Sequence, residues 1–293
     1  SDLETLEAEA QALRDEDAGL ASERYEALAL SSQILDEQVQ YYIESAILAE
    51  QNSDLERSEQ LFSTALVAAD LNTELNTKVG LRFAQFLLTH SKPQPALEQL
   101  QKLMAYQSLS TFQRAKLIFF TEQACEILGE DASKELEKFY ASVTSLPEVE
   151  ADLHMALSDL RLQHGQSEAA LEELRKAQGL DISDGLALRL IESTARAHDR
   201  LGNLPEAIAA YEELLSKAEP QGQTAQTATL ASADLWRREG NTKAAMSLLE
   251  TLTESANNDG RLRSRTLLVQ GRLLEEEDKI TEAADKYKAV LSI

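Results

Sequence analysis

Apolar and small residues recur along the chain at helical spacing, most clearly on the two sides of one turn. Gly202 and Asn203 interrupt the pattern, and Pro205 follows where a helix tolerates proline, because its missing N–H would be unpaired there. The spacing i, i+4, i+7 occurs before the turn at Ile191, Ala195 and His198, and after it at Ala207, Tyr211 and Leu214. Residues with this spacing share one helix face, so the stretch predicts a helical hairpin.

The same pattern returns at intervals of 36 to 38 residues. The predicted turn positions are Ser53, Ser91, Gly129, Gly165, Gly202, Gly240 and Asp278. Seven places before each turn stand Ala46, Ala84, Glu122, Ser158, Ala195, Ala233 and Gly271. Five places after each turn stand Ser58, Ala96, Lys134, Ala170, Ala207, Ala245 and Ala283. Nine places after stand Phe62, Leu100, Lys138, Leu174, Tyr211, Leu249 and Tyr287. Small residues at fixed places in both helices are what close packing within a hairpin requires.

This arrangement resembles the tetratricopeptide repeat, in which glycine, alanine, an aromatic residue and a further apolar residue recur through the second half of each unit. Gly202, Ala207, Tyr211 and Leu214 occupy those places. The resemblance implies an all-α fold, a right-handed superhelical solenoid of about seven to eight helix–turn–helix hairpins. The period near 38 exceeds the usual value of about 34 by roughly one helical turn.

Three parts of the array depart from the pattern. Residues 1–36 are predicted to form a capping or degenerate hairpin ahead of the array at 37–293. The unit at about 111–146 carries Lys134 and Lys138 at apolar places, so an irregular hairpin is expected there. The last predicted helix carries Ala283, Tyr287, Val290 and Leu291 with no polar cap after it, and solenoids usually need one. Either the native protein continues, or a partner or second copy covers this face.

Composition narrows the classes of partner. The chain has 293 residues, is 43% hydrophobic, and carries a net charge of −23, which disfavours nucleic acid and anionic membranes as partners. No run of eighteen apolar residues occurs, so no transmembrane segment is predicted. The chain begins with Ser1, which suggests a removed leader or an excised domain. This favours a periplasmic or cell-envelope location over a cytoplasmic one and leaves the compartment open.

Candidate chemistry is sparse. None of the four histidines lies four residues from another, and no glycine-rich phosphate loop or nucleophile elbow occurs. Cys125 is the single cysteine and stands in an apolar helical stretch, so it is predicted to be a buried small residue. We therefore expect no metal, no cofactor and no catalytic site.

Arginine placement is the strongest functional signal. The resemblance implies that the first helix of each hairpin lines a concave groove, where certain positions contact the partner. Those positions hold Arg189, Arg196, Arg200, Arg237, Arg238, Arg265 and Arg272, with Arg82 earlier in the chain. A groove for an acidic or carboxylate-bearing peptide is one interpretation, because guanidinium groups hold carboxylates through paired hydrogen bonds. The other is that each arginine pairs with a neighbouring acid, such as Glu192, Asp199, Asp234 or Glu275.

A second candidate surface is apolar. Its residues are Leu81, Phe119, Phe120 and Met155. They could form a hydrophobic pocket, or they could be core residues packed around the irregular unit. Both interpretations stay open at this stage.

Function follows from the resemblance rather than from a motif. A solenoid offers an extended surface, so we expect a non-catalytic scaffold, adaptor or assembly factor that binds a protein or peptide segment. The alternative is a self-associating structural module of a larger cell-envelope or secretion protein. The C-terminal helix would then mediate a homo-oligomer.

Overall fold

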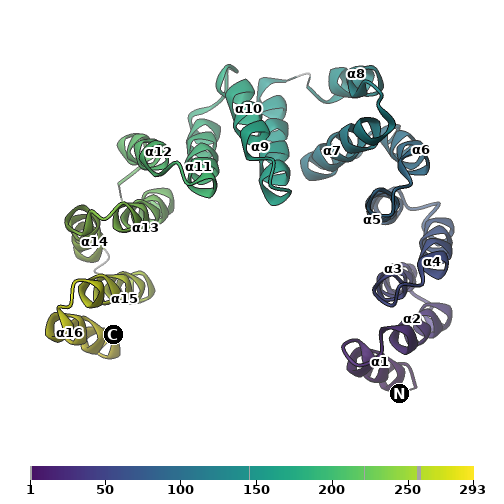
Figure 1. Cartoon of the computed structure of the whole chain (residues 1–293), viewed down its shortest axis with the longest axis horizontal. Coiled ribbons are helices and arrows are strands. Elements are labelled where there is room, and N and C mark those ends of the chain that lie inside the picture. Colours follow the sequence, from purple (N-terminus) through teal and green to yellow (C-terminus); the bar gives the residue numbers. More distant parts are fainter. Residues whose placement is uncertain (1, 145, 221, 256–258) are drawn as a thin grey trace. The chain divides into compact units, whose positions relative to one another are not determined.

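The computed structural model describes residues 2–144, 146–220, 222–255 and 259–293. Within these ranges the chain forms sixteen helices and no strand (Figure 1). Those of the first half are α1 Asp2–Leu13, α2 Ala18–Ser31, α3 Leu35–Gln51, α4 Leu55–Ala68, α5 Thr73–Thr89, α6 Pro93–Met104, α7 Thr111–Leu128 and α8 Ala132–Val143. Those of the second half are α9 Pro147–Gln163, α10 Ser167–Gln178, α11 Asp184–Leu201, α12 Leu204–Lys217, α13 Gln223–Arg238, α14 Thr242–Ser255, α15 Gly260–Glu276 and α16 Ile280–Leu291. The predicted all-α array of hairpins is confirmed.

The chain divides into two compact units, Ser1–Val143 and Thr144–Ile293. Unit 1 contains α1 to α8, and unit 2 contains α9 to α16. Within each unit the odd-numbered helices lie along one side and the even-numbered helices along the other (Figure 1). Some neighbouring odd-numbered helices contact one another directly, namely α3 and α5, α5 and α7, and α9 and α11. We call the odd-numbered helices the odd row of each unit.

All seven predicted turn positions adopt positive φ, from 56° at Ser91 to 85° at Gly240. In every one of these turns the N–H of the next residue donates to the carbonyl five places earlier, at 2.8 or 2.9 Å. This bond closes a left-handed C-terminal cap and satisfies a carbonyl that the helix end leaves unpaired. Because glycine reaches this conformation without steric cost, four of the seven turns use it.

Small residues do close the hairpins, as the pattern predicts. Ala195 on α11 and Ala207 on α12 are fully buried, and Tyr211 is 5% exposed. The hairpin α7–α8 departs from this arrangement. Lys134 and Lys138 are exposed there, and the interior is filled instead by Leu136 and Phe139. Its turn nevertheless has the same capping bond, so the irregularity lies in the helix face that α8 presents and not in the connection.

Two further expectations can be checked against the fold. Cys125 on α7 is fully buried, which confirms its assignment as a core residue, and burial raises the pKa of its thiol. No helix among the described residues is long and apolar enough to cross a membrane. The separation of a leading hairpin, 1–36, from the array stays a prediction.

Candidate partner-binding groove

The repeat register determines which side chains meet between neighbouring helices of the odd row. Residues 13 and 6 places before each turn are seven apart, so they share one helix face. In unit 2 the first set is Asp152, Arg189, Thr227 and Arg265, and the second set is Asp159, Arg196, Asp234 and Arg272. Each member stands one repeat away from the next, on the adjacent odd-numbered helix.

Between α9 and α11 both sets form ion pairs. The Arg189 guanidinium lies 3.1 Å from the Asp152 carboxylate, and that of Arg196 lies 2.9 Å from Asp159. Partners in both pairs are 37 residues apart, one repeat length. All four side chains are substantially exposed to solvent, so each pair contributes at most about 1 kcal/mol. These arginines are therefore already engaged within the repeat array.

Arg237 and Arg238 on α13 are engaged in a different way. Arg238 pairs with Asp199 on α11. Arg237 lies 2.9 Å from Asp234 on its own helix and 3.1 Å from Glu276 on α15. The hydrogen bonds that Arg237 donates to Asp234 are the main cause of its raised pKa, which keeps this guanidinium charged.

Arg265 and Arg272 on α15 differ from the arginines of α11. The position that matches Asp152 is occupied by Thr227, which has no charge to offer Arg265. The position that matches Asp159 is Asp234, whose carboxylate already binds Arg237. Across the described ranges, no carboxylate lies within ion-pair distance of either guanidinium.

These two arginines line a groove between α13 and α15. Its volume is about 470 Å³. The lining residues are Thr227, Leu230, Ala231, Asp234 and Arg237 from α13, and Arg265, Val269, Arg272 and Glu276 from α15. Leu230 and Val269 are partly buried against the core of the hairpin, so the groove has an apolar floor between two exposed cationic groups. Such a site can hold carboxylates and an aliphatic side chain together.

The interpretation that the arginines pair with acids of the same chain therefore holds for part of the set, and the groove for an acidic peptide stays a prediction. Four pair with acids, namely Arg189, Arg196, Arg237 and Arg238. Arg200, Arg265 and Arg272 have no such partner among the residues that the structure describes. Of the expected acids, Asp199 and Asp234 do form pairs, whereas Glu275 accepts a hydrogen bond from the Tyr287 hydroxyl at 2.8 Å.

Sequence reasoning missed Asp152, Asp159 and Glu276 as arginine partners. A signal for them was present, because these acids stand 37 to 39 residues from their arginines, close to the repeat length. None of the three acids is close to its arginine in sequence, so spacing within one helix does not reveal them.

The predicted apolar surface consists of buried side chains. Leu81 is 6%, Phe119 1%, Phe120 3% and Met155 4% exposed. Leu81 and both phenylalanines belong to unit 1, whereas Met155 packs into the core around α9 and α10 of unit 2. This burial matches the alternative, which assigned them to the core.

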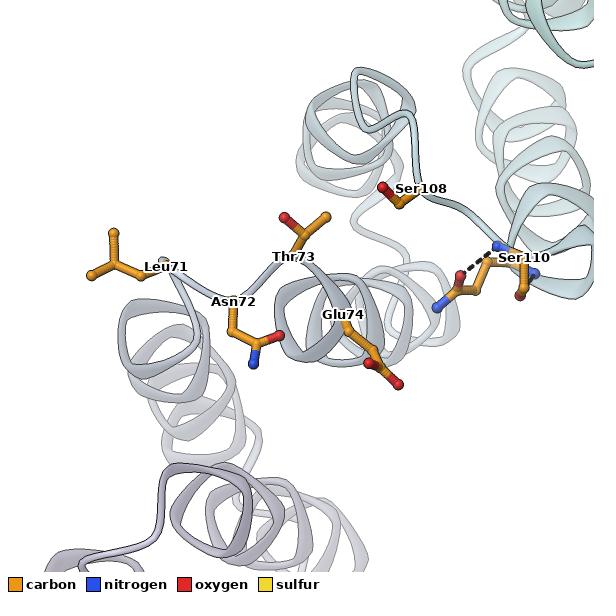
Figure 2. Close-up of a pocket in the computed structure, with 7 residues that line it drawn as sticks. Leu71, Asn72, Thr73, Glu74, Ser108 and Ser110 are labelled. Atoms are coloured by element: carbon orange, nitrogen blue, oxygen red, sulfur yellow. Dashed lines mark hydrogen bonds between the residues drawn. The ribbon is translucent and has the colours of Figure 1, made fainter.

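A second hollow, of about 600 Å³, lies at the N-terminal ends of α5 and α7 in unit 1 (Figure 2). Asn72 caps α5 by accepting from the Leu75 N–H at 3.0 Å, and Ser110 and Gln113 cap α7 reciprocally. Leu71 is 98% exposed and points away from the other labelled residues in Figure 2. Because the caps already satisfy these polar groups, the α13–α15 groove is the stronger candidate.

The chain carries no recognisable metal centre in its described portion, where no group of three or more His, Cys, Asp or Glu side chains could hold an ion. A family model described as tetratricopeptide repeat matches residues 193–260, from within α11 to the first residue of α15. This match identifies tetratricopeptide repeats within that part of the chain. The match covers α12, α13 and α14 and therefore includes one wall of the groove.

The fold of this chain resembles that of one solved structure at a TM-score of 0.50, and two others match it at lower scores. The apo form of RapI is 12% identical with a TM-score of 0.50, and the match covers 86% of this chain and 75% of RapI. YrrB, described as having an unusual peptide-binding site, is 14% identical with a TM-score of 0.35 over 76% of this chain and 88% of its own. The TPR2AB domain of yeast Sti1, solved as a pHSP90 complex, is 15% identical with a TM-score of 0.34 over 98% of both chains. No curated protein matches the chain in sequence.

Proposed function

We propose that this protein is a non-catalytic interaction scaffold that binds an acidic segment of a partner protein in the α13–α15 groove. The observation that carries the proposal is the pair Arg265 and Arg272, which lack carboxylate partners in a protein of net charge −23. Intramolecular acids neutralise the equivalent arginines on α11. An acidic ligand would provide carboxylates to the arginines of α15, as Asp152 and Asp159 do to those of α11.

The geometry suggests what such a ligand must offer. Arg265 and Arg272 are two helical turns apart, about 10 Å along the axis. Leu230 and Val269 line the groove with them, so a segment with acidic residues flanking an aliphatic one suits the site. Exposed arginine–carboxylate pairs contribute up to about 1 kcal/mol each, as on α11. Loss of each arginine should therefore weaken binding up to about fivefold, and loss of both by about tenfold or more.

Fluorescence anisotropy with a labelled peptide of alternating Glu-Leu-Glu triplets tests the proposal, beside the same peptide with Gln in place of Glu. We expect Arg265→Gln/Arg272→Gln to bind the acidic peptide at least tenfold more weakly than wild type. The matched control is Arg263→Gln/Lys288→Gln, which removes two charges from the same hairpin without touching a groove-lining residue. Equal affinity of wild type for the two peptides, or equal loss in control and test variants, would reject this site.

A second variant keeps both arginines. Thr227→Asp places a carboxylate where α9 has Asp152, one repeat before Arg265. We expect this change to alter the free energy of unfolding by no more than about 1 kcal/mol, as for an exposed ion pair. We also expect it to weaken binding of the acidic peptide. Pull-down from a native lysate with these same variants would then identify the partner whose retention follows the peptide data.

One observation favours self-association as a second candidate function. On α16 only Ala283 is buried, while Ile280 is 58% and Leu291 88% exposed. An apolar helix face of this kind can pack against a second copy. Sedimentation equilibrium of wild type and Leu291→Glu tests it, since a mass that is monomeric at all concentrations for both proteins would exclude this function.

A further inference from the structure

Unit 1 exposes large aliphatic side chains at one end of its first helices. Leu30, Ile34, Leu35, Val67 and Leu71 range in exposure from 41% at Leu35 to 98% at Leu71. They stand at the C-terminal ends of α2 and α4, at the first residue of α3, and in the connections that follow α2 and α4. We call these five residues the apolar edge. Exposed apolar residues that gather in one patch are typical of an interaction surface.

The topology brings the five residues to the same side of unit 1. Helices joined by short connections run antiparallel, so the end of α2, the start of α3, the end of α4 and the start of α5 lie together. One buried residue from each of these four helix ends belongs to a single core cluster, namely Ala29, Val39, Ala69 and Leu75. The apolar edge lies directly outside this cluster, because its members alternate in sequence with the buried residues.

The exposure of Leu71 is not imposed by the repeat register. Leu71 stands immediately before Asn72, which caps α5, and Leu109 stands in the same place before Ser110, which caps α7. An apolar residue at this place commonly packs against its own helix. Leu109 is buried, at 6% exposure, whereas Leu71 is 98% exposed and points away from the other labelled residues in Figure 2. The fold therefore leaves almost the whole Leu71 side chain unpacked.

The surroundings of the apolar edge are acidic. Between Arg24 and Lys78 the sequence has ten Asp or Glu residues and one basic residue, Arg57. Arg57 pairs with Glu26 and stands near the start of α4, whereas the apolar edge is at the end of that helix. Neither α2 nor α4 has a basic residue in its last turn, so no cation of these helices offsets the negative end of the helix dipole.

Three exposed acids directly adjoin the apolar edge in sequence, namely Asp36, Asp70 and Glu74. We propose that the apolar edge binds a partner-protein segment whose aliphatic or aromatic side chains are flanked by lysine or arginine. Charge complementarity selects this occupant. A second copy of the chain, with its net charge of −23, would bring like charges to the same place, and an anionic membrane is disfavoured for the same reason.

This inference rests on the proposed function as a scaffold but not on the α13–α15 groove. The apolar edge uses different residues in a different unit, and it lies at the helix ends of the connections between hairpins and not along the faces of the odd row. It also prefers a ligand of the opposite charge. The protein would then hold an acidic segment and a basic, apolar segment at separate places.

Methyl NMR provides a direct readout during titration with a helical peptide of Leu and Lys, beside the same peptide with Glu in place of Lys. Ile34→Val and Leu71→Met assign two signals of the apolar edge. We expect both signals to shift saturably with the Lys peptide and to stay in place with the Glu peptide. An equal response to the two peptides, or an equal shift at the exposed Ile127 of α7, overturns the proposal. A shift at Ile34 that grows with protein concentration in the absence of peptide also overturns it, because a second copy would then cover this surface.

Paired variants measure how much the apolar edge contributes to affinity. Val67→Thr/Leu71→Gln keeps the size of both side chains and removes apolar surface, so it should bind the Lys peptide at least tenfold more weakly than wild type. The matched control is Leu55→Gln/Ile127→Thr. These residues are 39% and 55% exposed and stand at the opposite ends of helices α4 and α7 in the same unit. An equal loss in the control and in the test variant overturns the proposal.

Stability separates a docking residue from a structural one. Leu71→Gln should leave the unfolding midpoint unchanged, whereas Leu109→Gln, at the buried counterpart, should lower it by about 5 °C or more. A similar loss for both variants would show that Leu71 packs within the protein and would overturn the proposal. Arg265→Gln/Arg272→Gln should bind the Lys peptide as wild type does, and Val67→Thr/Leu71→Gln should keep its affinity for the Glu-Leu-Glu peptide, so the two sites can fail separately.

Discussion

Glu173 on α10 carries a buried negative charge, and its neutralisation tests how much this charge stabilises the α9–α10 hairpin of unit 2. Its side chain is only 4% exposed. The carboxylate accepts from His154 Nδ1 on α9 at 2.7 Å, from Lys176 at 3.1 Å and from Arg161 at 3.4 Å. Glu173→Gln keeps the shape of the side chain and one acceptor oxygen, but removes the charge that these three donors share.

The expected loss is about 3 kcal/mol in the free energy of unfolding. Removing one partner of a buried ion pair costs about 3–5 kcal/mol, and the remaining amide oxygen places this substitution at the low end. Lys176 is 49% exposed, so most of the effect comes from His154 and Arg161. Glu172→Gln is the matched control, since Glu172 is 56% exposed and bonds only the exposed Arg175 in the described chain. That change should cost less than about 1 kcal/mol.

Urea unfolding followed by circular dichroism at 222 nm measures both variants. With a slope of about 1–3 kcal/mol per molar urea, the midpoint of Glu173→Gln should fall by about 1 M or more. Equal midpoints for Glu173→Gln and Glu172→Gln at neutral pH would refute the reasoning, because burial would then make no difference to the same chemical change.

The pH dependence of Glu173 provides a second check. Burial raises the pKa of this carboxyl, but the bonds from His154, Lys176 and Arg161 outweigh it and hold the pKa below its ordinary value. A depressed pKa stabilises the fold fully above the unfolded value of about 4.3, and this stabilisation is lost as the pH falls through the folded pKa. The difference between wild type and Glu173→Gln should therefore shrink in acid. A difference that grows on acidification would contradict the assignment.

Three smaller predictions concern turns, exposed pairs and one histidine. Ser91→Gly should stabilise the protein by up to about 1 kcal/mol and Gly202→Ala should destabilise it by a similar amount, because both positions have positive φ; urea titration would contradict this if the signs were reversed. Arg196→Gln should cost less than about 1 kcal/mol, and the cost should disappear in 1 M NaCl if it comes from the exposed pair with Asp159. Burial lowers the pKa of His198, so an NMR titration should give a value below about 6.5, and stability should fall as the pH drops below 6.5; a higher value would show that burial does not control this ring.

The turns were predictable because each is a local structure. The capping bond joins residues five apart, and its geometry depends on little outside the turn itself. Glycine marked four of the seven turns, and the period alone located Ser53, Ser91 and Asp278. The buried small residues followed from the same register, since close approach of two helices leaves no room for a larger side chain.

Partners on neighbouring repeats were harder to predict. Arg189 and Asp152 meet because α9 and α11 lie side by side, and no feature within either helix indicates the pairing. Hairpin α7–α8 was predictable in part. Lys134 and Lys138 break the pattern, and the apolar residues Leu136 and Phe139 are shifted in phase against it, so an irregular hairpin was expected. Packing then shows that Leu136 and Phe139 fill its interior.

Recognition in such an array depends on where its repeats differ. Positions inside the hairpins are buried in nearly every unit, so substitution there changes stability before it changes specificity. In unit 2 the side chains 13 and 6 places before the turn are partly or largely exposed, and those of α9 and α11 pair across one repeat. A charge at such a position is therefore either paired within the array or accessible to a ligand. On α11, Arg189 and Arg196 are already paired with Asp152 and Asp159 of the preceding odd-numbered helix. On α15 the counterpart of Asp152 is Thr227, and only that difference leaves Arg265 available. A pattern averaged over all repeats does not contain this difference between Thr227 and Asp152. The repeat pattern therefore predicts the fold of the chain but does not predict which helices form the candidate site.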